Sequence, residues 1–319
     1  MSVMLETKHL KKYFTTPRGL LHAVDDVNLA VEAGTTLGVV GESGCGKSTL
    51  GRVVLRLLEA TDGEVIFEGQ DVTKMNKKEL VAFRNQAQII FQDPYASLNP
   101  RLTVSEIIAE PLIAGHLYKN RAEIDRRVFK MMDTVGLAAR LVNTYPHELD
   151  GGRRQRIGIA RALVLDPKFI VCDEPVSALD VSIQAQILNL LMDLQKDKGL
   201  AYMFITHDLS VVKHISDQIA VMYLGCCVER GPAKEIFANP LHPYTKALLQ
   251  AIPVPNLSRR GAKRQILTGE VSSPIEPKPG CRFAARCPHA TDACRKADIP
   301  LTERTPGHFC ACCLDGAGE

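Results

Sequence analysis

The segment at residues 41–48, GESGCGKS, constrains the fold more than any other part of the chain. It matches the pattern G-x-x-x-x-G-K-[S/T], in which glycines let backbone N–H groups wrap around phosphate oxygens. The apolar run at 35–40 predicts a buried strand before it. Apolar residues at helical spacing follow it: Leu50, Val53, Val54 and Leu57. A strand, this loop and a helix in that order predict a parallel α/β fold that binds a nucleotide, with a ligand-free glycine turn as the alternative.

The loop residues have separate predicted roles. Lys47 would reach the β- and γ-phosphates, and the Ser48 hydroxyl would help to hold Mg²⁺. The helix that begins near Lys47 would add the positive end of its dipole. The predicted nucleotide-binding residues of this segment are Gly41, Ser43, Gly44, Cys45, Gly46, Lys47, Ser48 and Thr49.

Two adjacent carboxylates, Asp173 and Glu174, follow the apolar run at 169–172. Such a pair at the end of a buried strand is costly unless a positive group meets it, and Mg²⁺ would do so. We predict Asp173 as the magnesium anchor and Glu174 as the general base, or orienter, of the attacking water. A solvated acidic turn is the alternative.

Composition excludes several classes of protein. The chain has 319 residues, 45% of them hydrophobic and 24% charged, as in an ordinary globular protein. The formal net charge of +3 is too small to indicate nucleic-acid or membrane-surface binding. No apolar run approaches the roughly 20 residues that cross a bilayer, and the first residues show no secretory signal. We therefore expect other chains to provide any membrane-spanning part.

The pattern along the chain changes twice. Short apolar runs alternate with helical patterns up to about residue 250, with further strands predicted at 169–172 and 202–205 and a helical stripe from Ile187 to Leu194 that ends at Gly199. Residues 93–155 interrupt this alternation with mainly helical patterns. After Pro253 the chain is rich in proline, arginine and cysteine.

Four further motifs follow an order known from one family. They are IFQD at 90–93, YPHELDGGRRQR at 145–156, SALD at 177–180 and THD at 206–208. With the phosphate loop, this set resembles ATP-binding-cassette (ABC) proteins over roughly residues 3–250. The resemblance implies an α/β P-loop NTPase fold with a RecA-like parallel sheet core and an antiparallel β edge. It also implies a helical subdomain at about 93–155 and a small Cys-rich C-terminal extension at 251–319.

The resemblance assigns roles to matching positions. Tyr13 would stack on adenine, with an ordinary edge-strand tyrosine as the alternative. Gln92 would contact Mg²⁺ and the attacking water, and His207 would hold the γ-phosphate. The implied catalytic residues are Glu174, His207 and Gln92, the implied magnesium ligands are Ser48, Gln92 and Asp173, and further nucleotide contacts are Gly151, Gly152 and Asp180.

One segment departs from the family pattern. The usual signature Ser-Gly-Gly-Gln is replaced by Asp-Gly-Gly-Arg at 150–153. In the family this segment caps the ATP of the opposite subunit, so a carboxylate at Asp150 would meet like charge. We hypothesise an asymmetric heterodimer in which the site capped by Asp150 is the weaker one. In the alternative, the glycine backbone carries the contact and Asp150 turns aside.

Six of the ten cysteines crowd into residues 281–313. The segment GCRFAARCP at 280–288 and the cysteines after it are similar to the C-terminal extension of dipeptide/oligopeptide importer ATPases. That resemblance implies a [4Fe–4S] cluster on Cys281, Cys287, Cys294 and Cys312, with Cys310 and Cys313 as alternates for the fourth position. Zinc and unligated thiols are the alternatives.

Together these features predict an ATP-hydrolysing subunit of a di- or oligopeptide importer at the cytoplasmic face of the membrane. The partners implied by the resemblance are a second ABC ATPase subunit, two transmembrane permease subunits and an extracytoplasmic solute-binding protein, and no nucleic acid. The alternatives are an importer ATPase for nickel or another small solute and, further off, a non-transport ABC ATPase.

Overall fold

The computed structural model describes residues 2–115, 117–118, 120–252 and 273–314. The chain forms two compact units, each assembled from segments that are distant in sequence. The first comprises Met1–Met4, Val31–Thr35 and Gly69–Phe204, and the second comprises Leu5–Ala30, Thr36–Glu68 and Ile205–Glu319. Of the C-terminal stretch predicted at 251–319, residues 253–272 and 315–319 lie outside the described residues.

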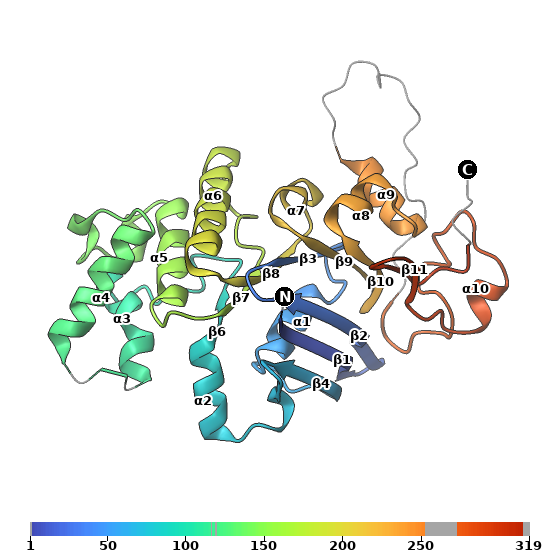
Figure 1. Ribbon diagram of the computed structural model, residues 1–319, viewed down its shortest axis with the longest axis horizontal. Coiled ribbons are helices and arrows are strands. Elements are labelled where there is room, and N and C mark those ends of the chain that lie inside the picture. Colours follow the sequence, from blue (N-terminus) through green and yellow to red (C-terminus); the bar gives the residue numbers. More distant parts are fainter. Residues whose placement is uncertain (1, 116, 119, 253–272, 315–319) are drawn as a thin grey trace, which may run out of the picture. The chain divides into compact units, whose positions relative to one another are not determined.

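The first unit holds a short parallel sheet and most of the long helices (Figure 1). Its strands are β5 (Gln70–Asp71), β6 (Ala87–Ile90), β7 (Phe169–Asp173) and most of β8 (Ala201–Thr206). Its α-helices are α2 (Lys77–Gln86), α3 (Val104–Ala114), α4 (Arg121–Thr134), α5 (Gly151–Leu163) and α6 (Val181–Lys198). Short 3₁₀ turns lie at Val72–Lys74, Ala139–Leu141 and Pro146–Glu148.

Strands β6 and β7 pair in parallel, with Ala87 opposite Phe169 and Ile90 opposite Cys172. Every residue of β7 is buried, which explains why its sequence is a continuous apolar run rather than an alternating one. Because the strands are parallel, the segments that follow β6 and β7 leave the sheet at the same edge. The predicted strand at 169–172 is therefore confirmed as β7.

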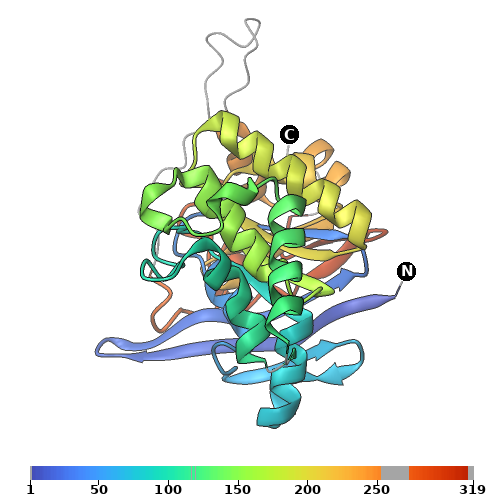
Figure 2. The same ribbon diagram turned by 90° about the vertical axis from the view of Figure 1, so that its left-hand side faces the viewer.

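Helices α3, α4 and α5 pack against one another, and Figure 2 shows them, in shades of green, facing the viewer. The N-terminus of each is fixed by a side-chain cap, that of α5 by Asp150. The Thr103 hydroxyl accepts the Glu106 N–H while Glu106 bonds back to the Thr103 N–H, and Asn120 accepts the N–H of Ala122. The helical patterns predicted within 93–155 are confirmed at α3 and α4.

The second unit holds most of the strands. They are β1 (Val3–Thr16), β2 (Gly19–Glu32), β3 (Thr36–Val40), β4 (Asp62–Phe67), β9 (Gln218–Tyr223), β10 (Cys226–Pro232), β11 (Thr302–Thr305) and β12 (His308–Cys310). The first two residues of β1 and the last two of β2 belong to the first unit. Its helices are α1 (Lys47–Val54), α7 (Leu209–Ile215), α8 (Ala233–Ala238), α9 (Pro243–Ala251) and α10 (Ala293–Lys296). No helix in the described ranges is both long and apolar enough to cross a lipid bilayer.

The second unit contains both parallel and antiparallel pairs of strands. Strand β3 runs parallel to β9, while β9–β10, β10–β12 and β12–β11 are antiparallel. Strand β1 pairs antiparallel with β4. The predicted mixed α/β class, with a parallel core and antiparallel strands, is confirmed, and the C-terminal segment at 273–314 adds two strands to the sheet that carries β3.

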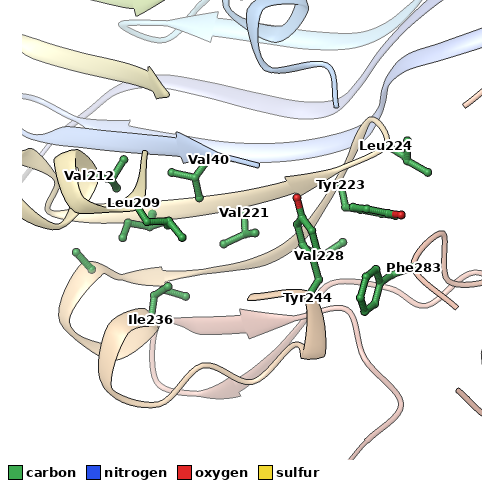
Figure 3. Packing of buried hydrophobic residues seen from close by; sticks show 12 residues of the cluster. Val40, Leu209, Val212, Val221, Tyr223, Leu224, Val228, Ile236, Tyr244 and Phe283 are labelled. Atoms are coloured by element: carbon green, nitrogen blue, oxygen red, sulfur yellow. The ribbon is translucent and has the colours of Figure 1, made fainter. Parts of the chain in front are cut away.

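The core of the second unit is drawn from β3, β9, β10, α7–α9 and the C-terminal segment. Its members are Val40, Leu209, Val212, Ile219, Val221, Tyr223, Leu224, Val228, Ala233, Ile236, Tyr244 and Phe283 (Figure 3). The Phe283 ring lies 5.3 Å from the ring centres of both Tyr223 and Tyr244. The C-terminal segment thus contributes a buried anchor to this core.

One predicted element ends early. Helix α1 stops at Val54, Arg56 adopts a left-handed φ of 48°, and Leu57 is 45% exposed. The expectation that Leu57 continues the buried helical stripe is wrong, because the left-handed turn at Arg56 redirects the chain.

Candidate nucleotide-binding site

The loop between β3 and α1 requires glycine at two positions. Gly41 has a φ of 153° and Gly46 a φ of 101°, values that residues with a Cβ rarely adopt. A Cβ on Gly41 would lie 2.2 Å from the carbonyl oxygen of Met222, and one on Gly46 would lie 1.9 Å from that of Ala23. The loop backbone is therefore held tightly against β9 and β2.

Lys47 folds back over this loop. Its Nζ donates to the carbonyl oxygens of Gly41 at 2.8 Å and Glu42 at 2.9 Å, and the residue is only 4% exposed. The ammonium group also lies 3.7 Å from the Cys45 sulfur, whose pKa is raised by burial. Neutral carbonyls are weaker partners for an ammonium group than phosphate oxygens are, so a phosphate chain would compete well for Lys47.

The remaining loop residues surround the start of α1. Ser43 and Gly44 are exposed, while Ser48 and Thr49 are half-buried in the first turn of the helix. The positive end of the helix dipole lies at this turn. The curled backbone, the buried ammonium and the serine hydroxyl together fit a magnesium-bound phosphate chain.

Tyr13 on β1 has polar neighbours. Its ring stacks on His22 with centroids 3.9 Å apart and planes 22° apart, and its hydroxyl donates to Asp25. Burial and Asp25 raise the pKa of Tyr13, so the hydroxyl stays protonated. His22 thus covers part of the ring that we predict to stack on adenine.

Gln92 and Glu174 meet at the edge where β6 and β7 end. The Gln92 Nε2 donates to the Glu174 Oε2 at 2.9 Å. Glu174 has a left-handed φ of 48°, which is strained for a residue with a side chain and is common at active sites. Asp173, one residue earlier, is 2% exposed at the end of β7. The structure thus brings together the two residues predicted to position and activate water.

The signature segment begins helix α5. Asp150 caps this helix, with its Oδ1 accepting the Arg153 N–H at 2.8 Å and its Oδ2 lying 3.3 Å from the Arg153 guanidinium. Gly152 is buried, and a Cβ there would lie 2.8 Å from Ile183 of α6. Gly151 occupies the first position of the helix. The carboxylate that replaces the usual serine therefore turns toward its own helix.

Two other predicted contact residues lie at element boundaries. Asp180 is exposed and caps α6 by accepting the Ile183 N–H at 3.0 Å. His207 is exposed between β8 and α7, where Asp208 caps α7. Exposed positions at the ends of secondary-structure elements are common places for binding and catalytic residues.

Two of the arginines that follow the signature are structural. Arg154 donates to the Pro146 carbonyl and lies 3.6 Å from the ring centre of Tyr95. Arg161 donates to the Ser97 carbonyl at 2.6 Å. These contacts fix the loop after Gln92.

The prediction of a [4Fe–4S] cluster is wrong. Its four predicted ligands do line one small cavity, together with His242 and Phe283: Cys281, Cys287, Cys294 and Cys312. Yet among the described residues, no group of three or more His, Cys, Asp or Glu side chains is arranged to hold a metal ion. All ten cysteines lie within those ranges and none forms a disulfide.

The four thiols of this cavity differ in burial: Cys294 and Cys312 are buried, whereas Cys281 and Cys287 are half-buried. The Cys294 sulfur lies 3.4 Å from the Thr291 hydroxyl oxygen. Burial raises the pKa of Cys281 to about 11.

Sequence reasoning missed a set of contacts around the phosphate loop. The Glu42 carboxylate accepts hydrogen bonds from both Nη groups of Arg286. The Glu42 backbone N–H donates to the Tyr244 hydroxyl at 2.9 Å. Arg282 donates to Asp25. The one sequence signal for these contacts is the spacing of Arg282 and Arg286, which lie four residues apart between Cys281 and Cys287.

Two known family models match separate parts of the chain. The ABC transporter family model matches residues 24–177, and the model of the oligopeptide/dipeptide transporter C-terminal region matches residues 228–294. Among solved structures, a dimeric ATP-binding cassette in a post-hydrolysis state bound to ADP and Pi is 29% identical, with a TM-score of 0.65 over 72% of this chain and 99% of that one. CbiO1 from Clostridium perfringens, part of an ABC transporter complex, is 28% identical with a TM-score of 0.66 over 75% and 92%.

Curated relatives match nearly the whole chain. The oligopeptide transport ATP-binding protein OppF of Escherichia coli is 53% identical over 98% of this chain and 93% of its own length. OppF of Bacillus subtilis is 60% identical over 79% and 83%, and the dipeptide transport ATP-binding protein DppF of Haemophilus influenzae is 50% identical over 97% and 96%. The chain therefore belongs to the ABC transporter family, in its branch of oligopeptide and dipeptide transport ATP-binding proteins.

Proposed function

We propose that this chain binds and hydrolyses ATP to power the import of di- and oligopeptides through membrane-spanning partners. One observation carries the catalytic part, namely the 2.9 Å hydrogen bond between Gln92 and Glu174 at the end of two adjacent parallel strands. The kinship with OppF and DppF supports the peptide part.

In this proposal the phosphate loop holds the substrate. Lys47 exchanges the carbonyls of Gly41 and Glu42 for the β- and γ-phosphate oxygens. Ser48, Gln92 and Asp173 are oxygen donors of the kind that Mg²⁺ prefers, and the ion would neutralise charge on the phosphates. The other proposed nucleotide contacts are Tyr13, Gly41, Ser43, Gly44, Cys45, Gly46 and Thr49.

The hydrolytic step uses side chains at the edge of the first unit's sheet. Glu174 accepts a proton from water as the water oxygen attacks the γ-phosphorus, and the bond to the ADP oxygen breaks. Gln92 donates to Glu174 and orients the water. His207 holds the γ-phosphate and senses its departure. In a closed dimer, the N–H groups of Gly151 and Gly152, with Asp180, contact the nucleotide of the opposite subunit.

Glu174→Gln tests the catalytic part. The amide cannot take a proton, so we expect kcat to fall at least about 100-fold with ATP affinity little changed. Asp193→Asn, an exposed carboxylate on α6, is the matched control and should keep wild-type turnover. Turnover of Glu174→Gln at the wild-type level would refute the proposed base.

The proposed assembly places the chain at the cytoplasmic face of the membrane with a second ABC ATPase subunit, two permease subunits and an extracytoplasmic solute-binding protein. We propose a nucleotide-binding domain at 3–250, with a helical subdomain at about 93–155, and a C-terminal extension at 251–319. The family kinship supports this division and these partners.

Uptake by cells tests the cargo. Cells that lack the native gene and produce the wild-type chain should accumulate a labelled tripeptide, whereas cells that produce Lys47→Ala should not, because the phosphates lose their ammonium partner. Labelled Ni²⁺ is the comparison substrate. Uptake of nickel and not of peptide would contradict the peptide assignment while leaving the ATPase assignment in place.

A further inference from the structure

Two arginines of the C-terminal segment, Arg282 and Arg286, contact the nucleotide-binding residues of the second unit. The Arg286 Nη1 lies 2.8 Å from one carboxylate oxygen of Glu42, and its Nη2 lies 3.1 Å from the other. Glu42 belongs to the phosphate loop itself. The two Arg286 bonds form the parallel, two-point geometry that is strongest between guanidinium and carboxylate groups.

This contact is shielded from water and held by a rigid frame. The Arg286 side chain is 7% exposed and that of Glu42 is 27% exposed. The Arg286 N–H donates to the Phe283 carbonyl at 2.9 Å, and Phe283 is buried beside Tyr223 and Tyr244 (Figure 3). The position of Arg286 is thus set by the core of the second unit rather than by a mobile surface chain.

Because Glu42 is part of the phosphate loop, the bonds that hold its carboxylate also restrain the loop backbone. The Glu42 backbone N–H donates to the Tyr244 hydroxyl, and its carbonyl accepts the ammonium group of Lys47. A displaced Glu42 would therefore shift a partner of Lys47. Without Arg286, the Glu42 carboxylate would also stand uncompensated beside a triphosphate and repel it.

Arg282 links the C-terminal segment to Tyr13 through Asp25. It donates to Asp25 and to the Leu224 carbonyl. Burial opposes ionisation of Asp25, but hydrogen bonds from Tyr13 and His22 and the charge of Arg282 lower its pKa, so Asp25 stays an acceptor for the Tyr13 hydroxyl.

We propose that Arg282 and Arg286 are positioning residues of the nucleotide site. Arg286 orders the phosphate loop and neutralises Glu42, and Arg282 orders Tyr13 through Asp25. Neither arginine touches the reacting atoms in this scheme. The role of Arg282 rests on the proposed stacking of Tyr13 on adenine.

The test for Arg286 compares ATP affinity and kcat in the full-length chain. Arg286→Gln should weaken ATP binding about tenfold, a loss that grows at low ionic strength, while kcat at saturating ATP changes less. Arg295→Gln, an exposed arginine of the same segment, is the matched control and should bind ATP like the wild type. Removing both charges, in Arg286→Gln with Glu42→Gln, should restore most of the affinity.

Arg286→Lys keeps the charge with one bond fewer and should give intermediate affinity, and it replaces Arg286→Gln if that variant does not fold. Equal ATP affinity in the Arg286 and Arg295 variants would overturn the proposal. So would a double variant no better than Arg286→Gln, because a merely structural role would not be repaired by removing the opposite charge.

Binding of inorganic tripolyphosphate distinguishes the proposed role of Arg286 from that of Arg282. Because tripolyphosphate lacks adenine, its affinity should fall in Arg286→Gln but not in Arg282→Gln, whereas ATP affinity should fall in both. Loss of tripolyphosphate binding in Arg282→Gln would overturn the assignment of Arg282. Failure of the wild-type chain to bind ATP at all would instead refute the proposed function, so the two failures are distinguishable.

Discussion

At the scale of single residues, Gly46 shows how closely the phosphate loop approaches the strand beside it. A Cβ there would lie 1.9 Å from the Ala23 carbonyl oxygen, at a left-handed φ of 101°. We predict that Gly46→Ala weakens ATP binding more than about tenfold, because the loop must move to relieve the clash. Equilibrium binding of labelled ATP measures this.

Gly69→Ala is the matched control. Gly69 also has a left-handed φ, of 81°, but a Cβ there would meet nothing within 4 Å. That variant should lose about 1 kcal/mol of stability and keep its ATP affinity. Equal ATP affinity in Gly46→Ala and the wild type would show that the loop tolerates a side chain at this point.

The buried side chain of His242 makes the free energy of unfolding depend on pH. It is 1% exposed, and burial lowers its pKa from 6.5 to about 4, partly opposed by the charge of Glu229. Between these values the unfolded chain takes up a proton that the folded chain does not. The contribution of His242 is therefore fully present above about pH 6.5 and is lost as the pH falls toward 4, by up to about 3 kcal/mol.

Urea unfolding at about pH 7.5 and pH 4.5 tests this prediction. His242→Asn keeps a hydrogen-bond acceptor and removes the titration, so its free energy of unfolding should fall less between the two pH values. His9→Asn, which removes an exposed histidine, should behave like the wild type. An unchanged pH dependence in His242→Asn would contradict the prediction.

The sequence motifs singled out side chains that the structure brings together, such as Gln92 and Glu174. The Gln92–Glu174 pair and the phosphate loop come from motifs whose chemistry requires those side chains in a fixed order. The arginine partners were missed because Arg282 and Arg286 act on residues distant in sequence, and no local pattern marks such a contact. The iron–sulfur cluster was predicted wrongly because a resemblance in cysteine positions does not reveal whether the described side chains are arranged to hold a metal ion.

At the scale of elements, Phe283 is the anchor of the C-terminal segment. It is 1% exposed against Tyr223 and Tyr244. We predict that Phe283→Ala lowers the free energy of unfolding by about 3 kcal/mol. Phe129→Ala, on α4 and 45% exposed, should cost less than about 1 kcal/mol. A similar small loss in both variants, measured by thermal unfolding, would show that Phe283 does not hold the segment in place.

The buried elements were the most predictable ones. Strands β3, β7 and β8 and helices α3, α4 and α6 follow predicted apolar runs and stripes, because burial on a sheet or helix face leaves a regular pattern. The pairing of β12 with β10 was not predictable in this way. It joins residues about 80 positions apart, such as Glu229 and Cys310, and the short strand has no alternation long enough to recognise.

At the scale of the whole molecule, Asp150 bears on the proposed asymmetric heterodimer. Its charge stabilises the start of α5, the end that would face the partner's γ-phosphate, so it competes with that phosphate for the positive helix end. We predict that Asp150→Ser raises turnover at the partner's site about fivefold. Serine also caps helices, so α5 should persist.

The assay uses heterodimers in which Lys47→Ala silences this chain's own site, leaving only the partner's ATP to be hydrolysed. Asn76→Ser, which changes the cap of α2 in the same way, is the control and should have no effect. Unchanged turnover with Asp150→Ser would argue against asymmetry.

The two arginine contacts also set an order of events during protein synthesis. Asp25 and Arg282 stand 257 positions apart, and Glu42 and Arg286 stand 244 apart. At about 5–20 residues per second, the ribosome finishes the phosphate loop many seconds before either arginine exists. A product cut short before residue 281 would carry every residue of the phosphate loop yet lack both partners that order it. We therefore expect a product of this length to bind ATP more weakly than a chain that includes both arginines, so full nucleotide affinity is reached only after the C-terminal segment has been made and has packed against the second unit.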